Sequence, residues 1–169
     1  MGVFVGIVAK PALVRAEPAP ERGAPALSGP HLELRPHAGV GSLANLGSSS
    51  SAGYWHAGGR VLLTANQVQS YGIEVTHLGS KDRDFLTVGV VLEQKLWGWF
   101  LMGIGTVGYV KTGGSGRTDG SPFGVVSNLG WEPSWGRLSP FVSYRAEWIF
   151  ADSVLLGSSL SAGATLQLF

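Results

Sequence analysis

The 169-residue chain has no cysteine and carries little charge. The absence of cysteine excludes a disulfide scaffold, a cysteine-ligated zinc site and a thiol nucleophile. Lys, Arg, Asp and Glu together make up 14% of the chain, whereas a soluble domain typically carries about 25%. Twelve basic and eleven acidic residues leave a formal net charge of +1. Because nucleic-acid binding needs a clustered basic surface, we expect no nucleic-acid partner.

Long hydrophobic runs are also missing. The longest strongly apolar stretch without a charge, Leu96–Val110, has fifteen residues and contains four glycines. A membrane-spanning helix needs about 18–20 apolar residues, and each interior glycine costs about 1 kcal/mol of helix propensity. The sequence therefore predicts no transmembrane helix.

The first thirty residues differ from the rest of the chain. They begin apolar, and Val14-Arg15-Ala16 resembles the cleavage site of a signal peptide. However, Lys10 interrupts the apolar core and no basic segment precedes it. We interpret residues 1–30 as a degraded or truncated signal peptide followed by a flexible Pro-rich segment, and residues 31–169 as the folded domain.

What the chain does have is glycine, 26 residues in all, and polarity that alternates with a period of two. Such alternation, broken by clusters of Gly, Ser, Asn, Asp and Pro, is typical of β-strands. Helical periodicity is weak throughout. We therefore predict an all-β chain with eight strands, at residues 31–46, 53–66, 69–79, 84–96, 99–112, 122–131, 137–151 and 155–169.

The two faces of these strands differ in charge. One face is apolar and carries no mid-strand charge, while the other carries four acidic and four basic side chains. Within three of the strands an acid and a base lie two residues apart, so they share a face. The charged set is Glu33, Arg35, Arg60, Glu74, Glu93, Lys95, Arg145 and Glu147.

Two barrel architectures fit eight alternating strands. A soluble, lipocalin-like ligand-binding barrel would put the apolar face inside and leave its water-exposed face with only eight charges. A membrane barrel inverts this arrangement, so that the apolar face meets lipid and the charges neutralise one another in a narrow lumen. We predict the second, an eight-stranded antiparallel up-and-down transmembrane β-barrel with a network of salt bridges in its lumen.

Aromatic residues gather near the strand ends, as in the two interfacial girdles of membrane barrels. With a periplasmic N-terminus, residues 113–121 form the longest outside loop and residues 132–136 a periplasmic turn. One predicted girdle, on the periplasmic side, contains Trp97, Trp99, Phe100, Trp131, Trp135 and Phe169. The other, on the outer side, contains Tyr54, Trp55, Phe85, Tyr109, Phe123, Trp148 and Phe150.

The C-terminal segment Ser161–Phe169 has a polar residue, a glycine, alternating hydrophobic residues and a terminal aromatic residue. With the strand count and the alternation, it resembles the small eight-stranded outer-membrane β-barrels of Gram-negative bacteria. This resemblance implies location in the outer membrane, contact with its lipids and lipopolysaccharide, and recognition by the barrel assembly machinery.

Few residues suggest chemistry. Some barrels of this kind are lipid A deacylases with a His/Ser/Glu site, and His77, Ser80 and Glu93 form a weak candidate for one. That family's compact His-x-Ser-Asn motif is absent. The four histidines form no i, i+2 or i, i+4 pair, so we expect neither a metal nor a cofactor.

These observations favour a non-enzymatic outer-membrane protein with a packed, salt-bridged lumen and a structural, envelope-stabilising or surface-interaction role. The alternatives are a lipid-modifying enzyme of the lipid A deacylase type and a narrow channel for small solutes. An eight-stranded lumen is just wide enough for side chains to fill it, which disfavours the channel.

Overall fold

The computed structural model describes residues 29–48, 50–66, 68–81, 83–96, 99–113, 122–151 and 153–169. The described residues form eight strands, whose bounds differ from the predicted ones by at most two residues. The predicted signal peptide and Pro-rich segment comprise residues 1–30, of which residues 1–28 lie outside the described part of the chain. The strands are β1 (His31–Asn45), β2 (Ser51–Thr64), β3 (Gln69–Ser80), β4 (Asp84–Lys95), β5 (Phe100–Gly113), β6 (Phe123–Trp131), β7 (Leu138–Phe150) and β8 (Val154–Gln167).

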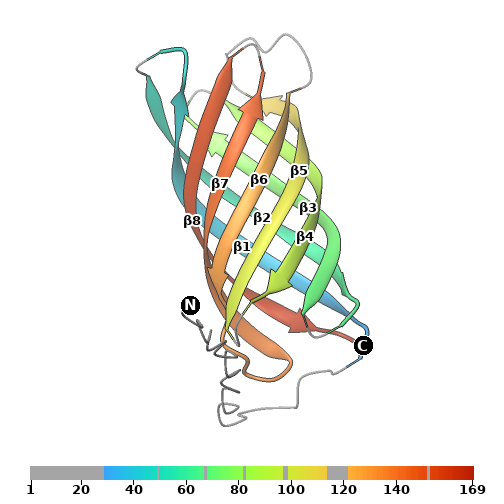
Figure 1. The fold of residues 1–169 in the computed structure, drawn as a ribbon. Helices are drawn as coiled ribbons and strands as arrows, with labels where there is room; N and C mark the ends of the chain where they lie inside the picture. Colours follow the sequence, from blue (N-terminus) through green and yellow to red (C-terminus); the bar gives the residue numbers. More distant parts are fainter. Residues whose placement is uncertain are drawn as a thin grey trace, which may run out of the picture.

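The strands form a single closed antiparallel barrel (Figure 1). Each strand pairs with its neighbours in sequence, and β1 closes the barrel on β8, for example through Leu34 opposite Leu166 and Ala38 opposite Ala162. Closure leaves no unpaired sheet edge, so the strands satisfy one another's backbone N–H and C=O groups. The predicted all-β, up-and-down eight-stranded barrel is confirmed. Within the described residues, no helix has the length and apolarity needed to cross a membrane.

The two ends of the barrel are distinguished by the chain termini. At one end, here called the terminus end, β1 begins beside the C-terminal residues, and the Leu32 amide donates to the Phe169 carbonyl oxygen (3.0 Å). The connections that follow β2, β4 and β6 also lie there. At the opposite end, the loop end, β1, β3, β5 and β7 finish and the strands that follow them begin (Figure 1).

The polarity of the barrel is inverted relative to a soluble protein. Strand β5 shows the alternation: Leu101 and Val107 are buried, whereas Met102 and Ile104 are exposed. Val90 and Leu160 on the outer face are 60% and 66% exposed, although aliphatic side chains normally lie inside. The most buried large side chains, in contrast, include Arg35, Glu74 and Glu147.

The connection between β6 and β7 turns sharply at Gly136, which has a φ of 89°. A side chain at this φ meets steric strain that glycine avoids. The Trp135 amide donates to Ser139 Oγ (3.2 Å) just beyond the turn. This turn brings β7 back beside β6 at the terminus end.

Candidate functional site: the lumen of the barrel

Three arginines from different strands point into the lumen. Arg35 lies on β1, Arg60 on β2 and Arg145 on β7, and each is at most 3% exposed. Successive residues of a strand face opposite sides of the sheet. Because the neighbours of each arginine along its strand are not charged and face outward, the arginine itself faces inward. Buried charges are costly unless they are paired and hydrogen-bonded. The partners of these arginines therefore decide whether the barrel is stable.

Arg60 and Arg145 meet at one carboxylate. Arg60 Nε lies 2.6 Å from Glu74 Oε2, and Arg145 Nη1 lies 2.5 Å from Glu74 Oε1. Arg145 also pairs with Glu147 (2.6 Å), and Arg60 Nη1 pairs with Glu93 Oε1 (2.5 Å). Glu74 has no exposed surface. Each of these charges thus exchanges water for an oppositely charged, hydrogen-bonded partner.

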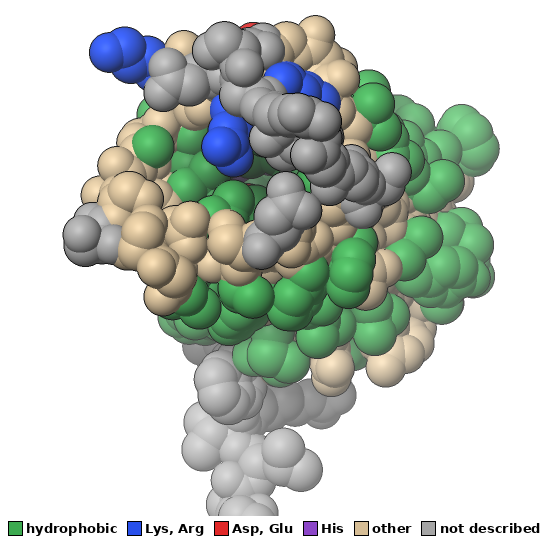
Figure 2. Space-filling model, turned by 90° about the horizontal axis from the view of Figure 1, so that it is seen from above, with side chains coloured by type: hydrophobic (Ala, Val, Ile, Leu, Met, Phe, Trp, Pro, Cys, Tyr) green, Lys and Arg blue, Asp and Glu red, His purple; other side chains and the backbone are tan. Residues whose placement is uncertain are grey.

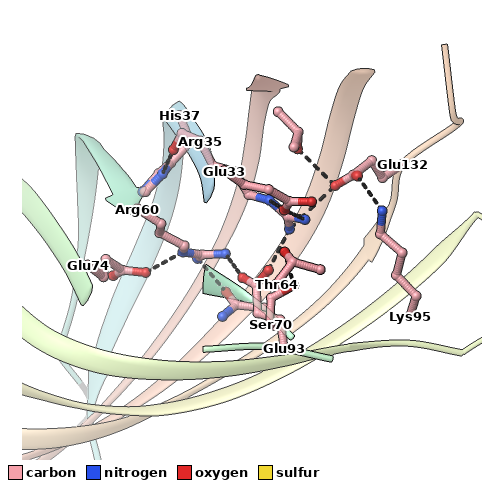
Figure 3. Close-up of polar contacts among 12 residues, drawn as sticks. Glu33, Arg35, His37, Arg60, Thr64, Ser70, Glu74, Glu93, Lys95 and Glu132 are labelled. Carbon is pink, nitrogen blue, oxygen red and sulfur yellow. Dashed lines mark hydrogen bonds and ion pairs between the residues drawn. The ribbon is translucent and has the colours of Figure 1, made fainter. Parts of the chain in front are cut away.

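Arg35 continues the chain of ion pairs toward the terminus end (Figure 3). Its guanidinium lies 2.6 Å from Glu33 Oε2 and 2.5 Å from Glu93 Oε2. Glu93 therefore joins Arg35 to Arg60. The result is a continuous line of alternating acids and bases: Glu147, Arg145, Glu74, Arg60, Glu93, Arg35 and Glu33. Together with Glu132, which pairs with Arg35, and Lys95, which pairs with Glu132, these residues are here called the lumen network.

Glu132 belongs to the lumen network, although the sequence analysis placed it in a periplasmic turn. Its carboxylate lies 3.2 Å from Lys95 Nζ and 3.4 Å from Arg35 Nη1, and it accepts a hydrogen bond from Thr165 Oγ1 (3.0 Å). Lys95 therefore pairs with Glu132 and makes no ion pair with Glu93, its neighbour in the predicted set. The missed signal was the phase of β6: Trp131 faces outward, so the next residue faces inward.

Replacing Glu132 by glutamine tests whether its ion pairs with Lys95 and Arg35 stabilise this end of the barrel. The variant keeps the size of the side chain and removes the charge that Lys95 and Arg35 face. We expect a loss of about 1–3 kcal/mol in the free energy of unfolding and faster trypsin cleavage at Arg137, in the exposed turn that Glu132 holds to the lumen. Urea titration and mass spectrometry of limited digests measure the two effects. Unchanged stability and unchanged cleavage would contradict this role.

Two tyrosines line the lumen on the loop-end side of the network. Tyr54 and Tyr109 are about 95% buried, and their hydroxyls donate to Glu147 at 3.4 and 3.3 Å. The sequence analysis placed both in the outer aromatic girdle, and this was wrong. Tyr54 precedes outward-facing Trp55, and adjacent strand residues face opposite sides of the sheet. Phe85, predicted in the same girdle, also packs inward, with its ring against Tyr109.

Beyond the tyrosines the lumen becomes apolar. Tyr54, Tyr109, Leu78, Val107, Val126 and Ile149 form a buried cluster, and Leu43, Phe85 and Leu155 pack against it. The lumen thus has a charged part toward the terminus end and an apolar part toward the loop end. The sequence analysis assigned apolar strand residues to the outer face and did not anticipate this second part.

Two histidines lie buried within the lumen. His56 Nε2 lies 3.2 Å from Ser161 Oγ, and His37 Nε2 lies 3.3 Å from Thr76 Oγ1. Their ring centroids are 5.8 Å apart. A third histidine, His31, contacts Glu33 at 3.0 Å. In the described part of the chain, no group of three His, Cys, Asp or Glu side chains is arranged to hold a metal ion.

The residues of the deacylase hypothesis do not come together. His77 faces outward on β3, with its ring against Trp55 and its Nε2 4.0 Å from Asp84 Oδ1. Ser80 donates to the backbone carbonyl of Arg83 (3.0 Å). Glu93 faces the lumen near the other end of β4 and is held by two arginines. The three side chains therefore form no His/Ser/Glu site.

Most aromatic residues predicted at the interfaces lie on the outer face near the barrel ends. Trp55 and Trp148 lie toward the loop end, 47% and 40% exposed. Trp99 and Trp131 pack edge to face at the terminus end, with ring centroids 6.3 Å apart. Predicted residue Trp97 lies outside the described residues. Trp135 and Phe169, both exposed, also lie at the terminus end.

A closed eight-stranded antiparallel barrel with an apolar outer face and a charged lumen is the fold of the small outer-membrane β-barrel proteins. A crystal structure of this class, that of Neisserial surface protein A, resembles the chain with a TM-score of 0.61 over 81% of this chain and 97% of that one. The two sequences are 14% identical, so the likeness concerns the fold. No protein-family model and no curated protein sequence matches the chain.

Proposed function

We propose that this protein is a non-enzymatic outer-membrane protein of a Gram-negative bacterium, with a structural, envelope-stabilising or surface-interaction role. The observation that carries the proposal is the inverted polarity: aliphatic side chains such as Val90 and Leu160 cover the outside, while arginines and glutamates fill the inside. Hydrocarbon is the solvent in which this arrangement is stable, because outward apolar groups meet lipid and inward charges meet one another.

A closed lumen supports a role other than transport. The lumen network links β1, β2, β3, β4 and β7 across the interior through ion pairs of 2.5–2.6 Å. The apolar cluster around Tyr54 and Tyr109 covers the network on the loop-end side. An ion crossing the barrel would have to break buried ion pairs and then enter an apolar region, where its desolvation is costly. We therefore propose that the barrel does not conduct small solutes.

The same proposal predicts which molecules would surround the barrel in the membrane. Outer-membrane lipids and lipopolysaccharide would contact the exposed aliphatic face, with Trp55 and Trp148 at one interface and Trp99 and Trp131 at the other. The barrel assembly machinery would recognise the C-terminal strand β8. The loop end would face the outside of the cell, and the terminus end, where β1 begins, would face the periplasm. No arrangement of side chains in the described residues favours the deacylase alternative.

Fractionation together with electrical recording tests this function. We expect the expressed protein to enter the outer-membrane fraction and to migrate faster on a gel when it is not boiled. Reconstituted in planar bilayers, it is expected to give no current steps. A purified protein that stays monomeric and folded without detergent would contradict membrane insertion. Discrete current steps would contradict the closed lumen, while leaving membrane insertion intact.

A further inference from the structure

A small cavity opens at the loop end of the lumen, beyond the two tyrosines. Its walls include Leu43, Leu78, Phe85, Ile149 and Leu155, and its volume is about 50 Å³. Viewed from this end, the mouth of the barrel is hollowed, with hydrophobic side chains inside it and Lys or Arg side chains near its rim (Figure 2). The cavity is separate from the lumen network, which lies on the other side of Tyr54 and Tyr109.

The side chains that line the cavity favour an apolar ligand. The volume exceeds the roughly 10–15 Å³ that one water molecule needs, but a buried water also needs two to four polar partners. Five aliphatic or aromatic side chains of the wall offer none, and the hydroxyl of Ser80, which also lines the cavity, donates to the Arg83 carbonyl oxygen (3.0 Å). The hydroxyls of Tyr54 and Tyr109 already donate to Glu147. A few carbons at the end of an alkyl chain match both the size and the polarity of this space.

The rim supplies a charged group. Arg83 lines the cavity, and its backbone is held in a tight turn, in which the Ser80 amide donates to the Arg83 carbonyl (2.8 Å) and the Arg83 amide donates to Ser80 Oγ (3.2 Å). Arg83 makes no ion pair with any acidic residue of the described chain. A guanidinium can bind a carboxylate through two parallel hydrogen bonds. An arginine whose backbone is held by hydrogen bonds thus lines an otherwise largely apolar cavity.

We propose that this cavity and Arg83 form a binding site for a medium-chain alkyl carboxylate, with the end of the chain between Leu43, Leu78 and Leu155 and the carboxylate on Arg83. The site goes beyond the proposed function, because it needs neither the lumen network nor a particular orientation in the membrane. It requires only that the loop end is open to water.

The absence of cysteine allows a direct test. In Leu155→Cys, a single thiol reports on the cavity through its reaction rate with a water-soluble methanethiosulfonate, measured on the folded barrel in lipid nanodiscs. Octanoate at about ten times its dissociation constant is expected to slow this reaction about tenfold. A thiol at exposed Ser48, introduced as Ser48→Cys, reports any general effect of octanoate on the loop end and is expected to react at an unchanged rate.

Two charge variants separate the carboxylate contact from the alkyl contact. Arg83→Gln is expected to weaken protection by octanoate at least about tenfold and to leave protection by octanol unchanged. Lys81→Gln is the matched control, because Lys81 belongs to the same connection but lies in a groove with outward-facing Val40 and Trp55. It is expected to leave octanoate binding unchanged.

The outcomes that would overturn the binding site are distinct from those that would contradict insertion into the membrane. Equal protection by octanoate in Arg83→Gln and in the parent, or equal protection by octyltrimethylammonium, would refute the carboxylate site. Absence of protection in the folded parent at any soluble octanoate concentration would refute the cavity as a binding site. If Leu155→Cys loses its heat-modifiable migration, Ala151→Cys, also in the cavity wall, replaces it as the reporter.

Discussion

Replacement of Arg60 by methionine is expected to destabilise the barrel by about 3–5 kcal/mol, the usual cost of removing one partner from a buried ion pair. Arg60 is 3% exposed and joins Glu74 to Glu93, and its Nη2 also donates to Asn128 Oδ1 (3.3 Å). Without it, the ion-pair partners left in the described part of the chain are Arg145 for Glu74 and Arg35 for Glu93. The midpoint of urea unfolding in lipid vesicles, followed by heat-modifiable migration, measures the loss.

Lys95→Met is the matched control for this variant. It also removes one cation from the lumen network, but the Lys95 side chain is 30% exposed and, among the described residues, makes a single ion pair, with Glu132. Partly exposed pairs contribute about 0–1 kcal/mol, so a small change is expected. Equal destabilisation by the two substitutions would mean that burial and the double pairing of Arg60 do not determine stability.

An arginine placed on the outer face is expected to have the second large effect. Val90 lies in the middle of β4, opposite Ile73 on one side and Thr106 on the other, and is 60% exposed. In water, Val90→Arg at such a position would be nearly neutral. In a bilayer an arginine near the midplane costs about 2–4 kcal/mol. We expect a loss of this size for the barrel folded in vesicles, measured by urea titration.

The comparison variant is Val110→Arg, on the same outer face but near the loop end of β5. Val110 is 58% exposed, so the two positions differ in depth along the barrel rather than in accessibility. Near an interface the cost falls to about 0–1 kcal/mol. A cost that does not depend on depth would contradict the proposed membrane-spanning orientation of the strands.

The errors of the sequence analysis share a physical origin. Tyr54 and Tyr109 were grouped with neighbouring aromatic residues by their position near strand ends, but strand phase decides which side of the sheet a residue faces. Glu132 was assigned to a turn because β6 ends at Trp131, yet the inward phase continues one residue past the strand. In both cases the residue was assigned from its position near a strand end. The period-two alternation along the strand, in contrast, predicts correctly that all three side chains face the lumen.

The sequence by itself determined the number of strands, their approximate bounds and the polarity of each face, because a period of two is a local property of an extended chain. Only the tertiary structure decided which acid meets which base. Arg145 and Glu74 are 71 residues apart, and Arg35 and Glu93 are 58 apart. Such partners meet across the lumen. Their heights along the barrel axis are set by the strand register and by the closure of β1 on β8, and both depend on all eight strands together. The apolar cavity beside Arg83 arises in the same way, since its walls come from strands that meet only when the barrel is closed.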